Sequence, residues 1–381
     1  MKKTNLVLAV AGAIVALSTM ASSAHAAVVY DKDGNSLEVY GRVQSVLYSG
    51  KVSGVSNEET SMSTSGRLGL NMRSALTSDV AAFANAEWEA ANGDSEETFS
   101  ARYLFVGLDF GQFGLIKAGK FEPAMKYAIS QTDIFEDWGA VGLTGADDRR
   151  NGVVQYEWSG AGFDVLFSYA FAKDGDPVGG AWDLGEAADI QSSVSAAAGY
   201  TSPDVLFGPV AVRFGFESGQ FADGMVDDGT GKLTEQNATG QHRFDDYRQF
   251  AAGLSWGSTD LGPYFAAQYQ QRKFNLASMA AGVSDVDYKV TGLEFVASYA
   301  LENGLTASTG YLTTETETEG DKIKAAVVPV FVNYQVNDQF NVWAEARFDA
   351  DTDNTSEKNY DLAMGTNFSE NAFSAGMRYA F

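Results

Sequence analysis

The sequence has 381 residues, of which 50 are Asp or Glu and 26 are Lys or Arg, so its formal net charge is −24 at pH 7. So acidic a chain is a poor match for nucleic acid phosphates, which need basic surfaces, and we expect no nucleic acid partner. It contains no cysteine, which excludes disulfides, thiol nucleophiles and cysteine-based metal sites.

The N-terminal segment has the features of a secretory signal. Two lysines precede an apolar run over residues 6–20, and Ala24-His25-Ala26 supplies the small residues that a signal peptidase requires. The run is short for a membrane-spanning helix, although an uncleaved anchor is the alternative. We therefore predict a cleaved signal peptide at residues 1–26 and a mature protein over residues 27–381. Cleavage leaves 24 basic and 50 acidic residues, a formal charge of −26.

Many stretches of the mature chain alternate with the period of two residues that is typical of β-strands. Within 79–91, for example, Ala86 and Trp88 belong to an apolar row, whereas Glu87 and Glu89 belong to a polar one. After residue 20 no apolar stretch is long enough for a membrane-spanning helix. Most of the alternating stretches are near the roughly 9–11 residues of a tilted membrane strand. Sixteen strands are predicted: 37–49, 64–75, 79–91, 98–110, 113–120, 150–158, 162–172, 191–200, 208–220, 246–257, 262–274, 288–301, 304–314, 322–336, 339–349 and 371–381.

The connections between these strands alternate between short ones and mostly long ones. The short connections are 76–78, 111–112, 159–161, 201–207, 258–261, 302–303 and 337–338. The others are 50–63, 92–97, 121–149, 173–190, 221–245, 275–287, 315–321 and 350–370. All tight turns therefore lie at one end of the sheet, as in outer-membrane barrels, whereas a Greek-key sandwich would scatter its long connections. We predict one all-β domain, a sixteen-stranded antiparallel transmembrane β-barrel.

The last predicted strand, NAFSAGMRYAF at 371–381, explains how such a barrel closes. Inside hydrocarbon every backbone N–H and C=O must be paired, so the last strand has to pair with the first one at 37–49. The alternative is an ordinary terminal strand of a soluble β-protein. In the barrel, the apolar row of the closing strand is predicted to face lipid, with its final ring in the aromatic girdle. This row consists of Ala375 and of the large side chains Phe373, Met377, Tyr379 and Phe381.

Three segments resemble a known family. AVVYDKDGNSLEVYGRV at the mature start, TDIFEDWG at 132–139 and the terminal MRYAF are similar to general diffusion porins of the Gram-negative outer membrane, of the trimeric osmoporin type found in gammaproteobacteria. The resemblance implies a homotrimer in the outer membrane, with one passive channel per subunit for small hydrophilic solutes and ions and with no cofactor. It also implies contacts with outer-membrane lipid and lipopolysaccharide, and recognition of the C-terminal strand by the barrel-assembly machinery.

The connection 121–149 is the longest, and loops longer than about 12–15 residues are usually functional or disordered. By the resemblance it is a constriction loop folded into the pore, with Asp133 and Asp137 facing the pore and Glu136 beside them. An outer loop lying over the mouth is the alternative. Glu89, on the inward row of its strand, is predicted to add to the acidic side.

Opposite the acidic segment, the resemblance implies a ladder of basic residues at inward strand positions: Arg42, Arg67, Arg102 and Arg149. The row that contains Arg42 is otherwise polar, and a lipid-facing arginine near mid-membrane would cost about 2–4 kcal/mol, so this row should face water. Arg149 is preferred to Arg150 because it shares a row with Asn151 and Gln155. Acids facing bases across a narrow pore create a transverse field that aligns polar solutes. The same arginines would alternatively brace the wall by pairing with lumen carboxylates.

Other functions find less support. An outer-membrane barrel hydrolase would need an activated nucleophile, and the only histidine of the mature chain, His242, lies in an acidic loop. A substrate-preferring porin would be marked by a pore-facing aromatic track, which the sequence does not locate. The acidic run at 349–354 lacks the glycine and the final glutamate of a calcium loop, so no metal site is predicted. We predict a channel, not an enzyme, and the excess of acids predicts a mild cation preference.

Overall fold

The computed structural model describes residues 26–49, 60–91, 98–139, 149–177, 187–227, 233–235, 238–239, 242–318, 320–356, 358 and 368–381. Residues 1–25 of the predicted signal peptide lie outside this part of the chain. Across these ranges, no helix is both long and apolar enough to cross a membrane.

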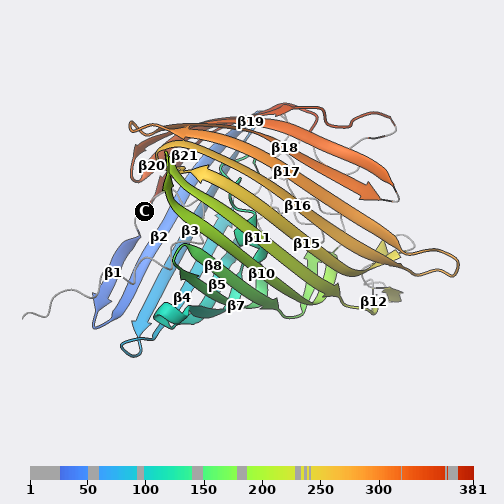
Figure 1. Cartoon of the computed structure of the whole chain (residues 1–381), viewed down its shortest axis with the longest axis horizontal. Coiled ribbons are helices and arrows are strands. Elements are labelled where there is room, and N and C mark those ends of the chain that lie inside the picture. Colours follow the sequence, from blue (N-terminus) through green and yellow to red (C-terminus); the bar gives the residue numbers. More distant parts are fainter. Residues whose placement is uncertain are drawn as a thin grey trace, which may run out of the picture.

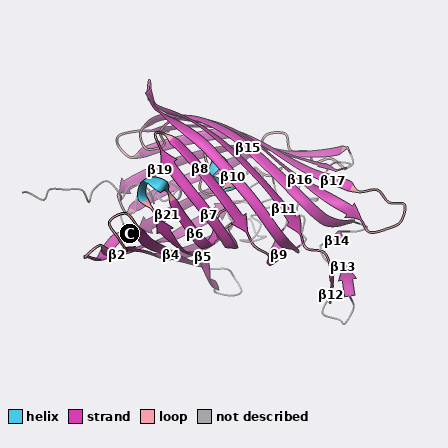
Figure 2. Cartoon of the chain, turned by 60° about the horizontal axis from the view of Figure 1, so that its bottom comes forward, coloured by secondary structure: helices cyan, strands magenta, loops and turns pink. Residues whose placement is uncertain are grey.

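Sixteen long strands form one closed antiparallel barrel (Figures 1 and 2). They are β2 (Asn35–Ser49), β3 (Thr60–Ala75), β4 (Ala81–Ala91), β5 (Thr98–Asp109), β6 (Leu115–Phe121), β7 (Arg150–Gly160), β8 (Phe163–Ala170), β10 (Ala187–Val205), β11 (Gly208–Phe221), β15 (His242–Gly257), β16 (Gly262–Ser278), β17 (Val286–Ala300), β18 (Leu305–Thr318), β19 (Asp321–Asn337), β20 (Phe340–Asp349) and β21 (Ala372–Ala380). The last of them pairs with the first, from Arg42 opposite Ala380 to Ser49 opposite Phe373. The predicted sixteen-stranded barrel and its closing strand are confirmed.

Shorter elements were not predicted from the sequence. They are β1 (Ala27–Lys32), the 3-10 helix η1 (Gly111–Phe113), the helix α1 (Met125–Ala128), β9 (Lys173–Pro177), β12 (Met225–Asp227), β13 (Leu233–Glu235) and β14 (Ala238–Thr239). Apart from β1 and η1, they lie within long connections, so they do not change the barrel order.

The strand β1 lies beside the start of β2 (Figure 1), in a segment where the sequence analysis predicts no strand. The turn itself is Asp33-Gly34, with φ angles of 54° and 78°, the left-handed geometry of a tight hairpin. Since β3 occupies the other edge of β2 along its whole length, β1 and β21 share one edge, end to end. Between them, Gly41 and Phe381 exchange two backbone hydrogen bonds of 2.9 Å.

The two faces of the barrel wall differ as the period-two pattern predicts. Outward side chains such as Phe265, Phe295 and Val332 are 48%, 48% and 42% exposed. Inward neighbours such as Gln268 and Glu294 are both 2% exposed. A soluble protein buries its apolar side chains, so an apolar belt on the outside and polar groups within match a wall that faces lipid outside.

Candidate functional site

The connection that follows β6 runs through the interior of the barrel. Its helix α1 begins where the backbone N–H groups of Ala124 and Met125 donate to Ser168 Oγ (3.1 Å) and Ser195 Oγ (2.7 Å), on the inward faces of β8 and β10. From β11, Arg213 donates to Ser130 Oγ at 2.7 Å, and its guanidinium lies 4.4 Å from the centre of the Tyr127 ring. The prediction of a loop folded into the barrel is confirmed.

The loop then follows the wall from β15 and β16 to β17. Gln131 donates to Ser255 Oγ at 2.8 Å, and Tyr264 returns a hydrogen bond of 2.7 Å to the Gln131 carbonyl. Thr132 donates to Glu294 on β17. These residues are buried, so the contacts are shielded from water and fix the path of the loop.

One carboxylate fastens the constricting segment 132–139 to the wall. Glu345 on β20 accepts three backbone N–H groups, from Glu136 (2.9 Å), Asp137 (3.0 Å) and Trp138 (2.7 Å). Glu345 is 3% exposed. Three donors on one acceptor hold the loop tip against β20, because the buried carboxylate would otherwise lack the hydrogen bonds that satisfy it.

The Asp137 carboxylate points to the same wall and not to the open lumen. It accepts hydrogen bonds from Tyr48 (3.0 Å), Trp343 Nε1 (3.1 Å) and Ser374 Oγ (2.5 Å). Burial raises the pKa of Asp137, and the three donors counteract part of that rise. The resemblance implies a pore-facing side chain for Asp137, and at its position the barrel wall supplies three donors to the carboxylate.

The other two acids of the segment reach cations. Glu136 is exposed at the loop surface and pairs with Arg378 of β21, with an Nη1–Oε1 distance of 2.9 Å. Asp133 lies 3.6 Å from the ammonium group of Lys126. Both acid side chains keep about a quarter of their surface accessible, at 27% and 24%. Their charges therefore remain in contact with lumen water.

Three predicted ladder arginines lie together on the inward faces of β2–β5, a surface that we call the open wall. Arg42 is opposite Arg67 in the β2–β3 register, and Arg67 is opposite Glu89. Glu89 accepts from Arg67 at 2.8 Å and from Arg102 at 2.6 Å, and Arg102 also reaches Glu87 at 2.9 Å. Glu89 thus lies among the bases, whereas the sequence placed it on the acidic side. Among the described residues, Arg42 has no ion-pair partner.

The structure places both Arg149 and Arg150 inside the barrel. The register between β6 and β7 shifts near Gly152, whose φ is 74°, because β7 has one extra residue there. Residues before this bulge therefore face the opposite side from the one that alternation along β7 predicts. Arg150 therefore joins the inward side and pairs with buried Glu217 on β11. Arg149, just before the strand, lies 3.5 Å from Glu122 in the loop and over the Tyr103 ring. Alternation along the sequence does not reveal this bulge, so it could not show that both arginines lie on the inner side of the barrel.

The inward faces of β15–β20, which we call the covered wall, are almost completely shielded. Exposure of inward polar side chains is 1% for Gln249, 3% for Arg272 and 0% for Thr314. Inward rings there are shielded as well, with Phe274 at 1% and Tyr288 at 9%. These rings are buried, so they do not form an accessible aromatic track. Side chains on the open wall are partly exposed, which indicates that the water-filled path through the barrel runs along that wall.

Sequence reasoning missed Arg378, although the alternation of the closing strand puts it on the polar row with Ser374. It also missed Glu345 as the loop anchor and Arg213 as a loop contact. The available signal was the alternation of inward and outward side chains along each strand, since all three residues lie on inward rows. This alternation does not show which of the inward residues contacts the loop.

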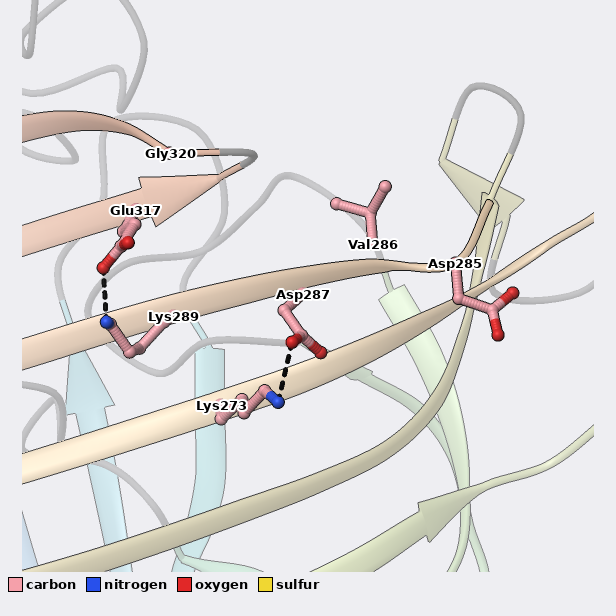
Figure 3. A pocket seen from close by; sticks show the side chains of 7 residues that line it. All are labelled: Lys273, Asp285, Val286, Asp287, Lys289, Glu317 and Gly320. Carbon is pink, nitrogen blue, oxygen red and sulfur yellow. Dashed lines mark ion pairs between the residues drawn. The ribbon is translucent and has the colours of Figure 1, made fainter. Parts of the chain in front are cut away.

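One hollow lies outside the lumen, at the long-loop end of β16–β18 (Figure 3). It is lined by Lys273 and Lys289, which alternate with the inward side chains of their strands, and by acids that neutralise them. Lys273 pairs with Asp287 at 2.7 Å, and Lys289 pairs with Glu317. Each lysine there already has a carboxylate partner, so this hollow is a salt-bridged outer surface and not the functional site.

Comparisons with known proteins agree with this geometry. A family model described as Gram-negative porin matches residues 11–349. The outer membrane porin PhoE of Enterobacter cloacae is 23% identical over the full length of both chains. Outer membrane porin N of Escherichia coli K12 is 25% identical over 77% of this chain and 76% of its own.

Solved structures show the same fold. The OmpF of Salmonella typhi, in complex with daunomycin, superposes with a TM-score of 0.70 at 19% identity, over 93% of this chain and all of that one. The trimer form of Vibrio cholerae OmpT gives 0.66 at 16% identity, over 92% and 100%. An anion-selective porin from Comamonas acidovorans gives 0.65 at 19% identity, over 91% and 100%.

Proposed function

The chain belongs to the Gram-negative porin family, whose members are passive outer-membrane channels and not enzymes, and we propose that its channel passes small hydrophilic solutes and ions with a mild preference for cations. The observation that carries the proposal is the pairing of the constriction arginines. Arg67 and Arg102 share Glu89, and Arg378 holds Glu136. Paired cations project little field into the lumen, so the overall acidic charge of the chain decides the preference.

The conductance of purified protein in a planar bilayer tests the channel. We expect stepwise, ohmic currents in KCl. The reversal potential under a KCl gradient tests the selectivity separately, and a clear anion preference would show that unpaired Arg42 outweighs the acids. The anion-selective relative from Comamonas acidovorans shows that this fold alone does not fix the sign.

We also propose that the channel works as a homotrimer, as the trimer form of Vibrio cholerae OmpT does. Conductance steps that appear and close in threes would support it, and so would an oligomer that resists dissociation in cold detergent. Single steps from a protein that sediments as a monomer in detergent would contradict it. Lipopolysaccharide is a proposed outer-leaflet neighbour, and its co-purification with the detergent-extracted trimer is the corresponding measurement.

The C-terminal strand is the proposed signal for the barrel-assembly machinery. Its outward side chains Phe373, Met377 and Tyr379 are 46%, 55% and 48% exposed on the lipid side, while Phe381 follows the strand and is hydrogen-bonded to Gly41. Replacing Phe381 by serine should slow insertion of the barrel in cells while leaving refolding into detergent less affected. Equal rates of insertion in cells for both proteins would refute this role.

A further inference from the structure

The β10–β11 hairpin carries an apolar tip at the short-turn end of the barrel. β10 pairs with β8 only as far as Tyr200, opposite Phe163, and then continues to Val205. Its tip is Val205-Leu206-Phe207, with exposures of 45%, 88% and 36%. Leu206 is the most exposed large apolar side chain of the described residues.

This tip is continuous with the lipid-facing belt. Phe207 stacks on Trp256, with ring centroids 4.1 Å apart and planes at 24°, and meets Phe265 edge-on at 6.2 Å. Phe265 belongs to the outward row of β16 and is 48% exposed. Trp256 Nε1 donates to the Val205 carbonyl at 2.8 Å, which fastens the tip to the belt. The hairpin therefore leans against the outer surface and not into the lumen.

The conformation of Leu206 is a second, independent observation. Its φ is 63°, in the left-handed region, which glycine adopts readily and which is unfavourable for a residue with a side chain. The other non-glycine residues with positive φ in the described chain are small or acidic: Asp33, Ala161 and Asp351. A leucine in this position is unfavourable both for the backbone and for contact with water. The apolar side chain of Leu206 must therefore make a favourable contact that compensates for both effects.

We propose that the β10–β11 tip inserts into the bilayer leaflet on the short-turn side, with phospholipid as its occupant. Lipid is the partner because the tip extends the belt that already faces lipid, through the Phe207, Trp256 and Phe265 rings. Asp204, exposed next to Val205, fixes the depth, since an ionised carboxylate remains in the aqueous headgroup layer. The tip thus occupies the boundary between headgroups and acyl chains, as interfacial aromatic residues do.

The experiment uses the absence of cysteine in the chain. Leu206→Cys carries a nitroxide label, and Asp338→Cys, in the exposed polar turn between β19 and β20, is the matched control at the same end. Both proteins are reconstituted in phosphatidylethanolamine–phosphatidylglycerol vesicles. Collisions of the label with apolar oxygen and with a water-soluble nickel chelate are measured. We expect the ratio of oxygen to nickel accessibility to be several-fold higher at position 206 than at position 338.

Equal ratios at the two positions would place the tip in water and overturn the proposal. Low accessibility to both reagents, with dipolar broadening between labels, would assign the tip to contact with a second copy and also overturn it. A further variant separates lipid contact from a packing role. Leu206→Gly relieves the backbone, so the melting temperature in detergent should be unchanged or raised, while insertion from urea into vesicles slows several-fold. Unchanged insertion kinetics would contradict the proposal.

Discussion

The open wall and the covered wall have the same inward polar rows but different environments. On the open wall, the side chains of Arg67 and Glu89 keep 24% and 21% of their surface accessible, so water still solvates their charges. On the opposite side, the constriction loop makes hydrogen bonds to β11, β15, β16, β17 and β20, and polar groups such as Glu217 and Gln249 are 0% and 1% exposed. Charges on the open wall act on solutes, whereas polar groups shielded on the opposite side act on stability.

The largest effect is expected for the buried Arg150–Glu217 ion pair, which joins β7 to β11. Arg150→Met leaves Glu217 buried without its cation, which should lower the free energy of unfolding by roughly 3–5 kcal/mol. Arg149→Met is the matched control, because its ion pair with Glu122 is longer, at 3.5 Å, and should cost less. Urea unfolding in detergent measures both. Equal losses would mean that the two arginines do not differ in role.

Loss of the loop anchor comes next. Glu345→Ala removes the acceptor of three backbone N–H groups in the constricting segment, at a cost of roughly 2–4 kcal/mol. The loop tip should then leave the wall, so single-channel current should become noisy and change in size. Glu315→Ala, on the outward face, is the control and should conduct like the native protein. A quiet, unchanged current from the Glu345 variant would refute the anchoring role.

Substitutions on the open wall should change the ion selectivity of the channel and leave its free energy of unfolding almost unchanged. Glu89→Gln removes the partner of Arg67 and Arg102, so cation preference should fall, by roughly two-fold in the permeability ratio. Arg42→Gln removes the one arginine of this group without a described ion pair, so cation preference should rise. Reversal potentials in a KCl gradient measure both. Shifts of the same sign in the two variants would contradict the pairing scheme.

The smallest expected effect is a difference in cation preference between variants of two acidic residues of the constriction loop. Asp133→Asn should reduce cation preference more than Asp137→Asn does, since Asp133 stays accessible and Asp137 faces three wall donors. The same reversal-potential measurement applies, and each variant is the control for the other. An equal reduction would show that the orientation of Asp137 has no effect on the field.

The raised pKa of Asp137 adds a pH dependence to this comparison. Because the folded protein binds this proton more tightly than the unfolded chain does, the contribution of Asp137 to stability is greatest at low pH. It is lost as pH rises from about 3.9, the ordinary value, through the raised pKa. Asp137→Asn should flatten the stability profile of the unfolding transition over that window, and a profile identical to that of the native protein would contradict the assignment.

Much of the fold was predictable because lipid outside and water inside impose alternation on every strand. The alternation located sixteen strands and their closure, although it began β15 at residue 246 instead of His242. The inserted loop was predicted only from the resemblance to porins. It did not predict β1, because a six-residue hairpin arm with all its side chains exposed has no buried row to reveal it. Nor did alternation reveal the bulge at Gly152, which decides how Arg150 points.

The site was less predictable, for a physical reason. The role of an inward side chain depends on strand register and on what the loop covers, and neither is encoded in a local pattern. Arg67 meets Glu89 because the β3–β4 register places them opposite each other. The Asp137 carboxylate lies against the wall because it accepts hydrogen bonds there from Tyr48, Trp343 and Ser374, which come from three different strands. These contacts join residues that are far apart in the sequence.

The seam between β2 and β21 has a consequence for biogenesis. Its partners, such as Arg42 and Ala380, come from opposite ends of the chain, so closing it carries a large cost in chain entropy. While the chain crosses the periplasm, both edges remain open, and unpaired edges favour aggregation. Folding of this topology is therefore most exposed to aggregation in the interval before β21 pairs with β2.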